Sequence, residues 1–381
     1  MNHFLKERIT NDFKNRFDKN PLVIFSPGRI NLIGEHTDYN NGFVFPAAID
    51  KGIYCAIEKS DKNYSTVIAL DIEDEFKIDL NSISKQLSGS WKNYVLGVIS
   101  EIQNKGKIID NFNLVFGGDI PSGAGLSSSA ALENSIVFGL NELFNLEFTK
   151  QEMIFISQKA EHNFVGVNCG IMDQFASMFG KENTALFLDC KDLSYDEINL
   201  ELKDFEIILI NTNIKHSLAE SAYNERRKTC ENITKQLNIN SLREANEKDL
   251  LEIKDSITEE DYSKGLYVIQ ENERVLAAKK AIKNNDIKSL GKLLFESHKG
   301  LSNQYKVSCE ELDFLVEKAM ESNAVIGSRM MGGGFGGCTI NLIKSSERES
   351  FITRIKQQYF QEFNTKCSVY EVKISNGTQI I

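Results

Sequence analysis

Glycines and serines crowd one short stretch of the chain, IPSGAGLSSSAALE at residues 120–133. Gly123 and Gly125 carry no side chain, so another group can come close to the backbone there. The serines at 127–129 open an expected helix, whose N-terminus carries unpaired N–H groups and the positive end of the helix dipole. A glycine-rich loop that leads into a helix is typical of a phosphate site, and serine hydroxyls can also bind Mg²⁺. A plain tight turn with serine caps is the alternative interpretation.

Several familiar nucleotide-binding patterns are excluded. The Walker pattern GxxxxGK[ST] and the HRD and DFG signatures of protein kinases do not occur in the sequence. A dinucleotide-binding unit needs a strand after its first helix, whereas a second helix is expected here. Residues 332–337 match GxGxxG literally, but they precede an expected strand instead of following one. We therefore interpret this glycine cluster as unrelated to dinucleotide binding.

A second polar cluster lies near the N-terminus, where residues 26–39 read SPGRINLIGEHTDY. Arg29, Glu35, His36 and Asp38 fall on a loop that we expect between two strands, and loops on a rigid scaffold commonly carry binding residues. Carboxylate acceptors beside an imidazole would suit a ligand with several hydroxyl groups. A solvated turn with local ion pairs is the alternative. The metalloprotease pattern HExxH does not occur.

Both segments resemble motifs of one enzyme family. GGDIPSGAGLSSSAALE at 117–133 resembles the nucleotide-binding motif of the GHMP kinases, and SPGRINLIGEHTDY resembles the sugar signature of the galactokinase family among them. GIMDQ, SAYNERRKTCE and SRMMGGGFGGCTI follow in the family's order and spacing, so the resemblance covers essentially the whole chain. It implies a transferase that uses ATP and Mg²⁺ to phosphorylate the C1 hydroxyl of α-D-galactose, giving α-D-galactose 1-phosphate and ADP in galactose metabolism.

The resemblance also implies a role for individual residues. Asp173, as the base, and Arg29, near the transferring phosphoryl group, are the catalytic pair. The sugar would be bound by Glu35, His36, Thr37, Asp38, Gly170, Asp173 and Tyr223. The nucleotide would be bound by Gly123, Ala124, Gly125, Leu126, Ser127, Ser128 and Ser129. Mg²⁺ would be bound by Ser129 and Glu161, although a lone glutamate on a helix is ordinarily a solvated carboxylate. Whether proton removal precedes phosphoryl transfer stays open, because a neighbouring arginine makes Asp173 a weaker base.

The elements that must position these residues follow from hydrophobic periodicity. We expect strands over 22–25, 42–49, 53–58, 65–70, 113–116, 184–189 and 206–211. A turn is expected at 26–28, and helices over 127–144 and 149–163, the second opened by a capping box at Thr149 and Glu152. Residues 217–325 are mainly helical in pattern, and the glycines at 332–337 lead into a strand.

This order of elements predicts an α+β fold. The resemblance implies the two-domain GHMP kinase fold, with an N-terminal domain like ribosomal protein S5 domain 2, a C-terminal ferredoxin-like α/β domain, and the active site in the cleft between them. We place the boundary at residue 190. Residues 1–190 would carry the sugar loop, the phosphate loop and Asp173, and residues 191–381 the third, glycine-rich motif.

Composition limits the partners. The chain has 381 residues and a formal net charge of -10, which argues against nucleic acid as the main partner. No stretch approaches the roughly 20 apolar residues that span a membrane, and the charged N-terminal segment lacks the apolar core of a signal peptide. We expect a cytoplasmic monomer that binds galactose and ATP and neither nucleic acid nor membrane. Two alternatives remain: a kinase of a related sugar such as N-acetylgalactosamine, or a non-catalytic galactose and ATP sensor, which the intact serine motif at 127–131 disfavours.

Overall fold

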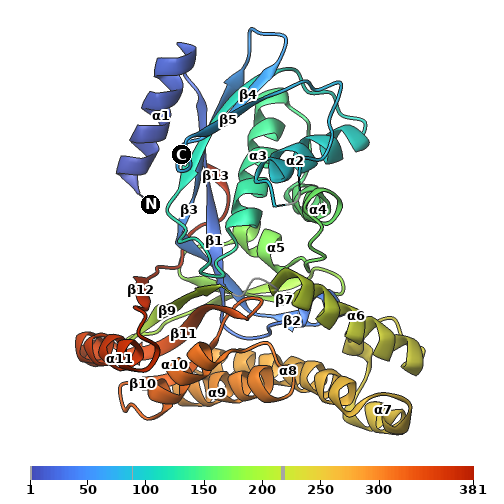
Figure 1. The fold of residues 1–381 in the computed structure, drawn as a ribbon, viewed down its shortest axis with the longest axis vertical. Helices are drawn as coiled ribbons and strands as arrows, with labels where there is room; N and C mark the ends of the chain where they lie inside the picture. Colours follow the sequence, from blue (N-terminus) through green and yellow to red (C-terminus); the bar gives the residue numbers. More distant parts are fainter. Residues whose placement is uncertain (1, 88, 216–218) are drawn as a thin grey trace.

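The computed structural model describes residues 2–87, 89–215 and 219–381. It has an upper part built on one large sheet and a lower part built on a second sheet with helices beneath it (Figure 1). The first sheet has six strands in the order β13–β1–β3–β6–β4–β5. Its strands are β1 (Leu22–Asn31), β3 (Pro46–Lys59), β4 (Ser65–Ala69), β5 (Asp74–Ile78), β6 (Phe112–Gly118) and β13 (Gln379–Ile380).

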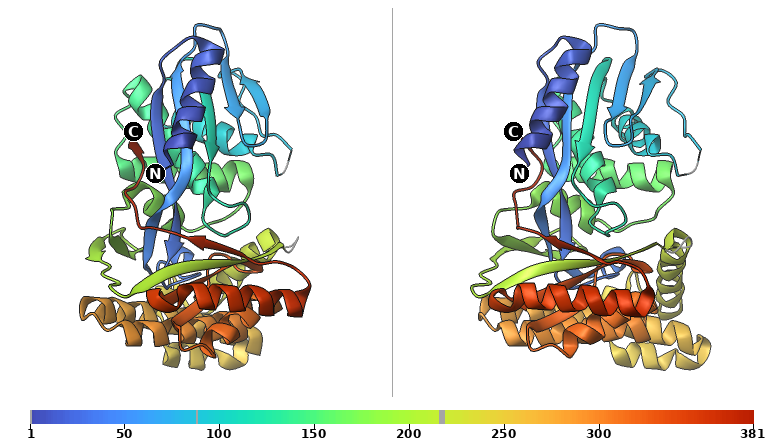
Figure 2. Two further views of the ribbon diagram at one scale, coloured as in Figure 1. Left: turned by 90° about the vertical axis from the view of Figure 1, so that its left-hand side faces the viewer. Right: turned by 60° about the vertical axis from the view of Figure 1, so that its left-hand side comes forward.

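Helices cover both faces of this sheet (Figures 1 and 2). On one face, α1 (His3–Phe17) buries Leu5, Ile9 and Phe13, which recur every four residues and so share one side of the helix. They pack with residues of β1 and β3 such as Phe25 and Tyr54. On the other face lie α2 (Lys92–Asn104), α3 (Ser128–Phe144), α4 (Lys150–Ala160) and α5 (Met172–Phe179).

The second sheet has four strands in the order β10–β11–β9–β12. These strands are β9 (Phe205–Lys215), β10 (Val325–Met330), β11 (Gly336–Lys344) and β12 (Ser368–Glu371). The helices of this part are α6 (Ala219–Leu237), α7 (Glu247–Glu252), α8 (Glu259–Lys283), α9 (Ile287–Asn303), α10 (Glu310–Met320) and α11 (Arg348–Phe363). A small third sheet pairs β2 (Phe43–Val44), β7 (Thr184–Asp189) and β8 (Tyr195–Asn199). One apolar cluster joins the lower end of β1 to β9, β11, α8 and α9, so the two parts share a buried interface.

One local prediction is wrong, and one predicted helix changes its type in the last turn. Residues 26–28 do not turn: β1 continues to Asn31, and a register shift between Pro27 and Arg29 accommodates the proline in its pairing with β3. The helix opened by the predicted capping box is confirmed, with both reciprocal hydrogen bonds between Thr149 and Glu152, but it ends at Ala160. One turn of π-helix, Glu161–Val165, follows it.

The α+β prediction is confirmed, with mixed sheets and helices in two parts. The boundary at residue 190 stays a prediction, and the final strand β13 pairs with β1 in the first sheet. Within the described residues, no helix combines the length and the apolar character needed to cross a lipid bilayer.

Candidate active site

The phosphate loop, residues 121–129, follows β6, includes the start of α3 and exposes the backbone of its glycines. Gly123 and Gly125 have φ angles of +70° and +69°, in the left-handed region that glycine adopts freely. The residues that follow these glycines, Ala124 and Leu126, are each only 1% exposed. They pack in the apolar cluster shared by the two parts and so anchor the loop. The glycine backbone is therefore turned outward, where a phosphate could approach it.

Two other segments support the phosphate loop from beneath. The Arg29 N–H donates to the Leu126 carbonyl oxygen at 3.1 Å. A Cβ placed on Gly332 would lie 3.3 Å from the Gly125 carbonyl oxygen, and one on Gly337 would lie 3.4 Å from that of Gly123. The glycine cluster at 332–337 thus lets two backbones pack closely, which agrees with our reading that it is no dinucleotide fingerprint.

Arg29 and Asp173 form a bidentate ion pair beside this loop. Arg29 Nε donates to Asp173 Oδ1 at 2.8 Å, and Nη2 donates to Oδ2 at 2.9 Å. Arg29 Nη1 donates to the Gly125 carbonyl oxygen at 2.5 Å, and the Ser127 hydroxyl donates to Asp173 Oδ2 at 2.5 Å. Burial by itself lowers the pKa of the Arg29 guanidinium, but the negative charges of Asp173, Glu35 and Asp38 and the hydrogen bond to Asp173 together outweigh it and raise that pKa above its usual value. The guanidinium therefore stays charged.

A cavity of about 130 Å³ opens next to this pair. It brings together predicted site residues from four distant segments of the chain: Arg29, Glu35, His36, Asp38, Glu161, Asp173 and Tyr223. The sugar turn, residues 34–38, supplies three of them and is buried throughout. Val167, Cys169, Met172, Gly332 and Gly333 complete the lining. Residues from several sequence motifs therefore line one cavity next to the phosphate loop.

Burial shifts the titration of two residues of the sugar turn. It raises the pKa of Asp38 to about 7, with help from the negative charge of Asp173. It lowers the pKa of His36 to about 3, so the imidazole is neutral at physiological pH. His36 Nδ1 shares a hydrogen bond of 2.8 Å with the Tyr39 hydroxyl, and the His36 ring lies 5.3 Å from that of Tyr223. The cavity thus offers a neutral imidazole, a phenol and carboxylates, a set suited to hydroxyl groups.

Glu35 has partners that the sequence motifs did not suggest. Its Oε1 accepts hydrogen bonds from Arg329 Nη2 at 3.1 Å and from the Gly332 N–H at 2.9 Å. Arg329 is fully buried, and its guanidinium also donates to the carbonyl oxygens of Asn31 and Leu32. Its position just before the glycine cluster, in SRMMGGG, was the only sequence signal available for it.

Two predicted sugar residues do not line the cavity. The Thr37 hydroxyl donates instead to the carbonyl oxygens of Gly34, at 2.9 Å, and Phe43, at 2.6 Å, so it closes the sugar turn. Gly170 lies against the Asp38 carboxylate so closely that a Cβ there would collide with it. A glycine at 170 therefore makes the room in which Asp38 can face the cavity.

Ser129 and Glu161, the predicted metal pair, are joined by a side-chain hydrogen bond. Glu161 is 7% exposed, so the solvated-carboxylate interpretation is wrong. Burial raises the pKa of its carboxyl group, while hydrogen bonds from Ser129, Cys169 and Gln174 oppose the rise. The Gln174 bond, from Nε2, is 2.9 Å long. No group of three or more His, Cys, Asp or Glu in the described parts of the chain could hold a metal ion. A hydroxyl and one carboxylate nevertheless fit Mg²⁺, which takes oxygen ligands and commonly completes its shell with water and substrate phosphates.

Family models match three stretches of the chain. They are the galactokinase galactose-binding signature over residues 11–59, the GHMP kinase N-terminal domain over 93–181 and the GHMP kinase C-terminal domain over 278–361. A galactokinase of Clostridium acetobutylicum is 42% identical over 389 aligned residues, covering 100% of this chain and 99% of that protein. A galactokinase of Thermosipho africanus is also 42% identical and covers 93% of this chain and 99% of that protein.

Solved structures agree. Lactococcus lactis galactokinase complexed with galactose matches with a TM-score of 0.94 and 36% identity, over 98% of this chain and 99% of that one. The mevalonate kinase of Methanococcus jannaschii matches with a TM-score of 0.67 at 17% identity, over 94% of this chain and 99% of that one, and so shares the fold. The chain therefore belongs to the galactokinase family of the GHMP kinases, enzymes that use ATP.

Proposed function

We propose that this kinase transfers the γ-phosphoryl group of ATP to the C1 hydroxyl of α-D-galactose, giving α-D-galactose 1-phosphate and ADP. The observation that carries the proposal is the position of Arg29. Its guanidinium touches the Gly125 carbonyl oxygen of the phosphate loop and also the Asp173 carboxylate of the cavity. A nucleotide on the loop and a sugar in the cavity would therefore meet at this one side chain.

In the proposed reaction, Asp173 receives the proton of the C1 hydroxyl. The oxygen of that hydroxyl bonds to the γ-phosphorus, and the bond from this phosphorus to the bridging oxygen of ADP breaks. Arg29 and Ser127 hold Asp173 in place through the hydrogen bonds described above. The permanent charge of Arg29 stabilises the charge on the transferring phosphoryl oxygens, which is the main demand of phosphoryl transfer.

The sugar hydroxyls are assigned to the cavity side chains of Glu35, His36, Asp38 and Tyr223. Two further residues contribute to the sugar site without lining the cavity. Thr37 closes the sugar turn, and Gly170 leaves space for the Asp38 carboxylate. The backbone from Gly123 to Leu126 and the hydroxyls of Ser127, Ser128 and Ser129 are assigned to the phosphates of ATP.

Ser129 and Glu161 are the proposed Mg²⁺ ligands, since both present oxygen at the junction of loop and cavity. A Mg²⁺ ion held by these residues would neutralise charge on the phosphates of ATP. We also propose that the enzyme acts in the cytoplasm as a monomer on these small molecules alone. Size-exclusion chromatography with light scattering tests the monomer, and a dimer mass would reject it.

A coupled ADP-release assay across a panel of free hexoses and N-acetylgalactosamine tests the function. We expect galactose to give the highest kcat/KM, and phosphorus NMR to show a 1-phosphate product. Preferential turnover of N-acetylgalactosamine would make the chain a kinase of that sugar. Binding of galactose and ATP without turnover would instead indicate a sensor, and either result would overturn the proposal.

A further inference from the structure

Glu271, on α8, lies outside the cavity but contacts the sugar turn. Its side chain is fully buried. Oε1 accepts a hydrogen bond of 3.0 Å from the Gly34 N–H and one of 2.6 Å from the Ser297 hydroxyl. Oε2 accepts one of 2.6 Å from Arg274 Nε. A buried carboxylate is costly unless it is paired and hydrogen-bonded, and these three contacts meet that requirement.

The sugar turn needs this external support because its backbone is strained at His36. Gly34 has a φ angle of +98°, which glycine adopts freely, but His36, which carries a side chain, has one of +63°. A positive φ at a residue with a side chain persists only where the surroundings hold it in place. The Gly34 N–H is buried and requires an acceptor, which Glu271 supplies. One turn earlier on α8, the Tyr267 hydroxyl donates to the Glu35 carbonyl oxygen at 3.0 Å.

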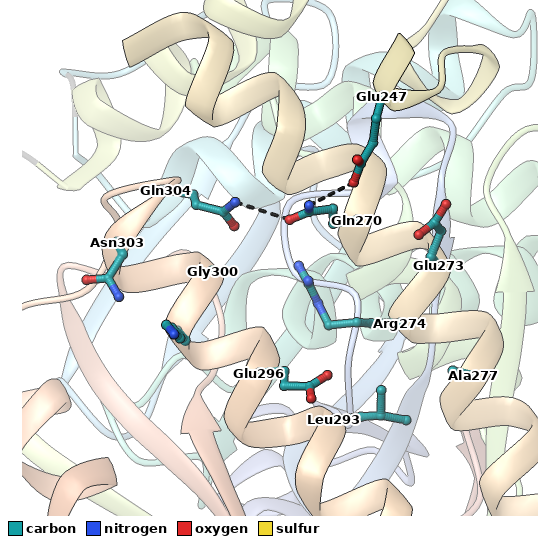
Figure 3. Close-up of a pocket in the computed structure, with 11 residues that line it drawn as sticks. Glu247, Gln270, Glu273, Arg274, Ala277, Leu293, Glu296, Gly300, Asn303 and Gln304 are labelled. Atoms are coloured by element: carbon teal, nitrogen blue, oxygen red, sulfur yellow. Dashed lines mark hydrogen bonds between the residues drawn. The ribbon is translucent and has the colours of Figure 1, made fainter. Parts of the chain in front are cut away.

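Arg274 connects Glu271 to the molecular surface. Figure 3 shows its side chain in a groove between α8, which carries Gln270, and α9, which carries Glu296. This groove has a volume of about 600 Å³ and is separate from the active-site cavity. Within the described residues, Arg274 Nη2 is buried without a hydrogen-bond partner. The guanidinium also lies over the Tyr267 ring, with Cζ 5.5 Å from the ring centroid. Arg274 thus supports Glu271 and Tyr267, the two side chains that hold the sugar turn, and it can be altered without changing either of them.

We propose that Glu271 is a positioning residue for galactose: braced by Arg274 and Ser297, it fixes the Gly34 amide and thereby the side chains of residues 35–38 in the cavity. The inference rests on the sugar-binding role proposed above for those residues. Small displacements of a binding residue are expensive, because hydrogen bonds to a rigid ligand depend steeply on geometry. The second half of the chain thus determines galactose affinity through a side chain that never touches the sugar.

The test compares Glu271→Gln with the wild-type enzyme in steady-state kinetics and in calorimetric galactose binding. We expect the KM and Kd for galactose to rise on the order of tenfold, because glutamine presents an amide donor to Arg274 and loses the charged pair. The KM for ATP stays within about twofold. Ser297→Ala should show a smaller rise in the same direction. Ser302→Ala on the same helix is the matched control, because Ser302 bonds Asp313 instead, and it leaves galactose affinity unchanged.

Arg274 supplies a second route if Glu271→Gln does not fold. Arg274→Gln should also raise the KM for galactose selectively, and Arg274→Lys, which keeps the charge, should restore most of the affinity. A lower melting temperature with an unchanged KM for galactose in both variants would show a merely structural role and overturn the inference. If the wild-type enzyme phosphorylates a different hexose, only the proposed function is contradicted. The same variants then test the inference through their KM for that hexose.

Discussion

The phosphate loop and the sugar turn lie side by side but are built on opposite principles. The phosphate loop exposes Ser122, Gly123, Gly125 and Ser128, and other backbone segments support it. The sugar turn, residues 34–38, is buried along its whole length and is held by side chains of Glu271 and Tyr267 from the second half of the chain. One region offers its backbone to a ligand, and the other offers side chains whose positions depend on distant residues.

This difference predicts different sensitivities. A backbone site tolerates most side-chain changes but fails where φ becomes incompatible with the new residue. A side-chain site responds to loss of single hydroxyl or carboxyl groups and to pH. Arg29 joins the phosphate loop to the cavity, because it contacts Gly125 and Asp173 together, and Ser127 of the loop also donates to Asp173.

Arg29→Ala should therefore have the largest effect. We expect kcat to fall on the order of 10³-fold, since the charge that stabilises the transferring phosphoryl group is lost. Steady-state kinetics measures this, with circular dichroism to verify that the variant is folded. Arg16→Ala, at a surface ion pair with Asp12, is the matched control and should keep wild-type turnover. If kcat fell less than tenfold in Arg29→Ala, Arg29 would have no catalytic role in phosphoryl transfer.

Gly125→Ala tests the backbone character of the phosphate loop. The φ of +69° disfavours alanine, and its Cβ would lie 3.4 Å from the Met331 carbonyl oxygen. We expect the KM for ATP to rise on the order of tenfold while the KM for galactose stays constant. Gly123→Ala is the paired variant, because it has a similar φ but open space around the new Cβ, and its effect should be smaller. An equal rise in both Michaelis constants would erase the distinction between the two regions.

The pKa of Asp38, raised by burial to about 7, predicts how stability varies with pH. The folded protein binds a proton at Asp38 that the unfolded chain, with an ordinary aspartate pKa, releases above about pH 4. This contribution is complete below that pH and is lost as the pH rises through 7. Between pH 6 and 8 the free energy of unfolding should fall by about 1 kcal/mol more in the wild type than in Asp38→Asn. Urea titrations measure both, and parallel pH profiles would contradict the raised pKa.

Tyr223→Phe should have the smallest effect, because the ring remains and only a hydroxyl is lost. We expect the KM for galactose to rise about threefold and the KM for ATP to stay unchanged. Tyr262→Phe, far from the cavity on α8, serves as the comparison. If Tyr223→Phe changed the KM for ATP instead, Tyr223 would belong to the nucleotide side.

The sequence predicted the two regions unequally well, for physical reasons. The phosphate loop is local: its glycines, its serines and the following helix adjoin one another in the chain, so composition and pattern suffice. The polar residues of the sugar turn revealed its position in the sequence. They did not reveal which residues hold the turn in place. Arg329, which bonds the Glu35 side chain, and Glu271, which accepts from the Gly34 N–H, lie more than 200 positions away from it, and the sequence does not pair either of them with the turn.

Both departures from the local expectations share one cause, which is tertiary context overriding a local signal. Pro27 and Gly28 read as a turn, yet the register shift in β1 absorbs the proline, and Gly28 lets the strand approach Leu126. Glu161 is assigned to Mg²⁺ from the resemblance alone, because a glutamate on a helix is ordinarily solvated; in the structure it begins the π-helical turn and accepts a hydrogen bond from Gln174. Neither the register shift nor the π-turn has a sequence signature of its own.

The most direct test of the proposed chemistry is the turnover of Asp173→Asn with both substrates saturating, measured alongside galactose binding by calorimetry. Asparagine keeps the shape of the side chain but cannot accept the proton. We predict a kcat reduced by about 10³-fold or more, with the galactose Kd within about threefold of the wild-type value. Turnover close to that of the wild type would contradict the account, because the C1 hydroxyl would then lose its proton without the carboxylate placed beside it.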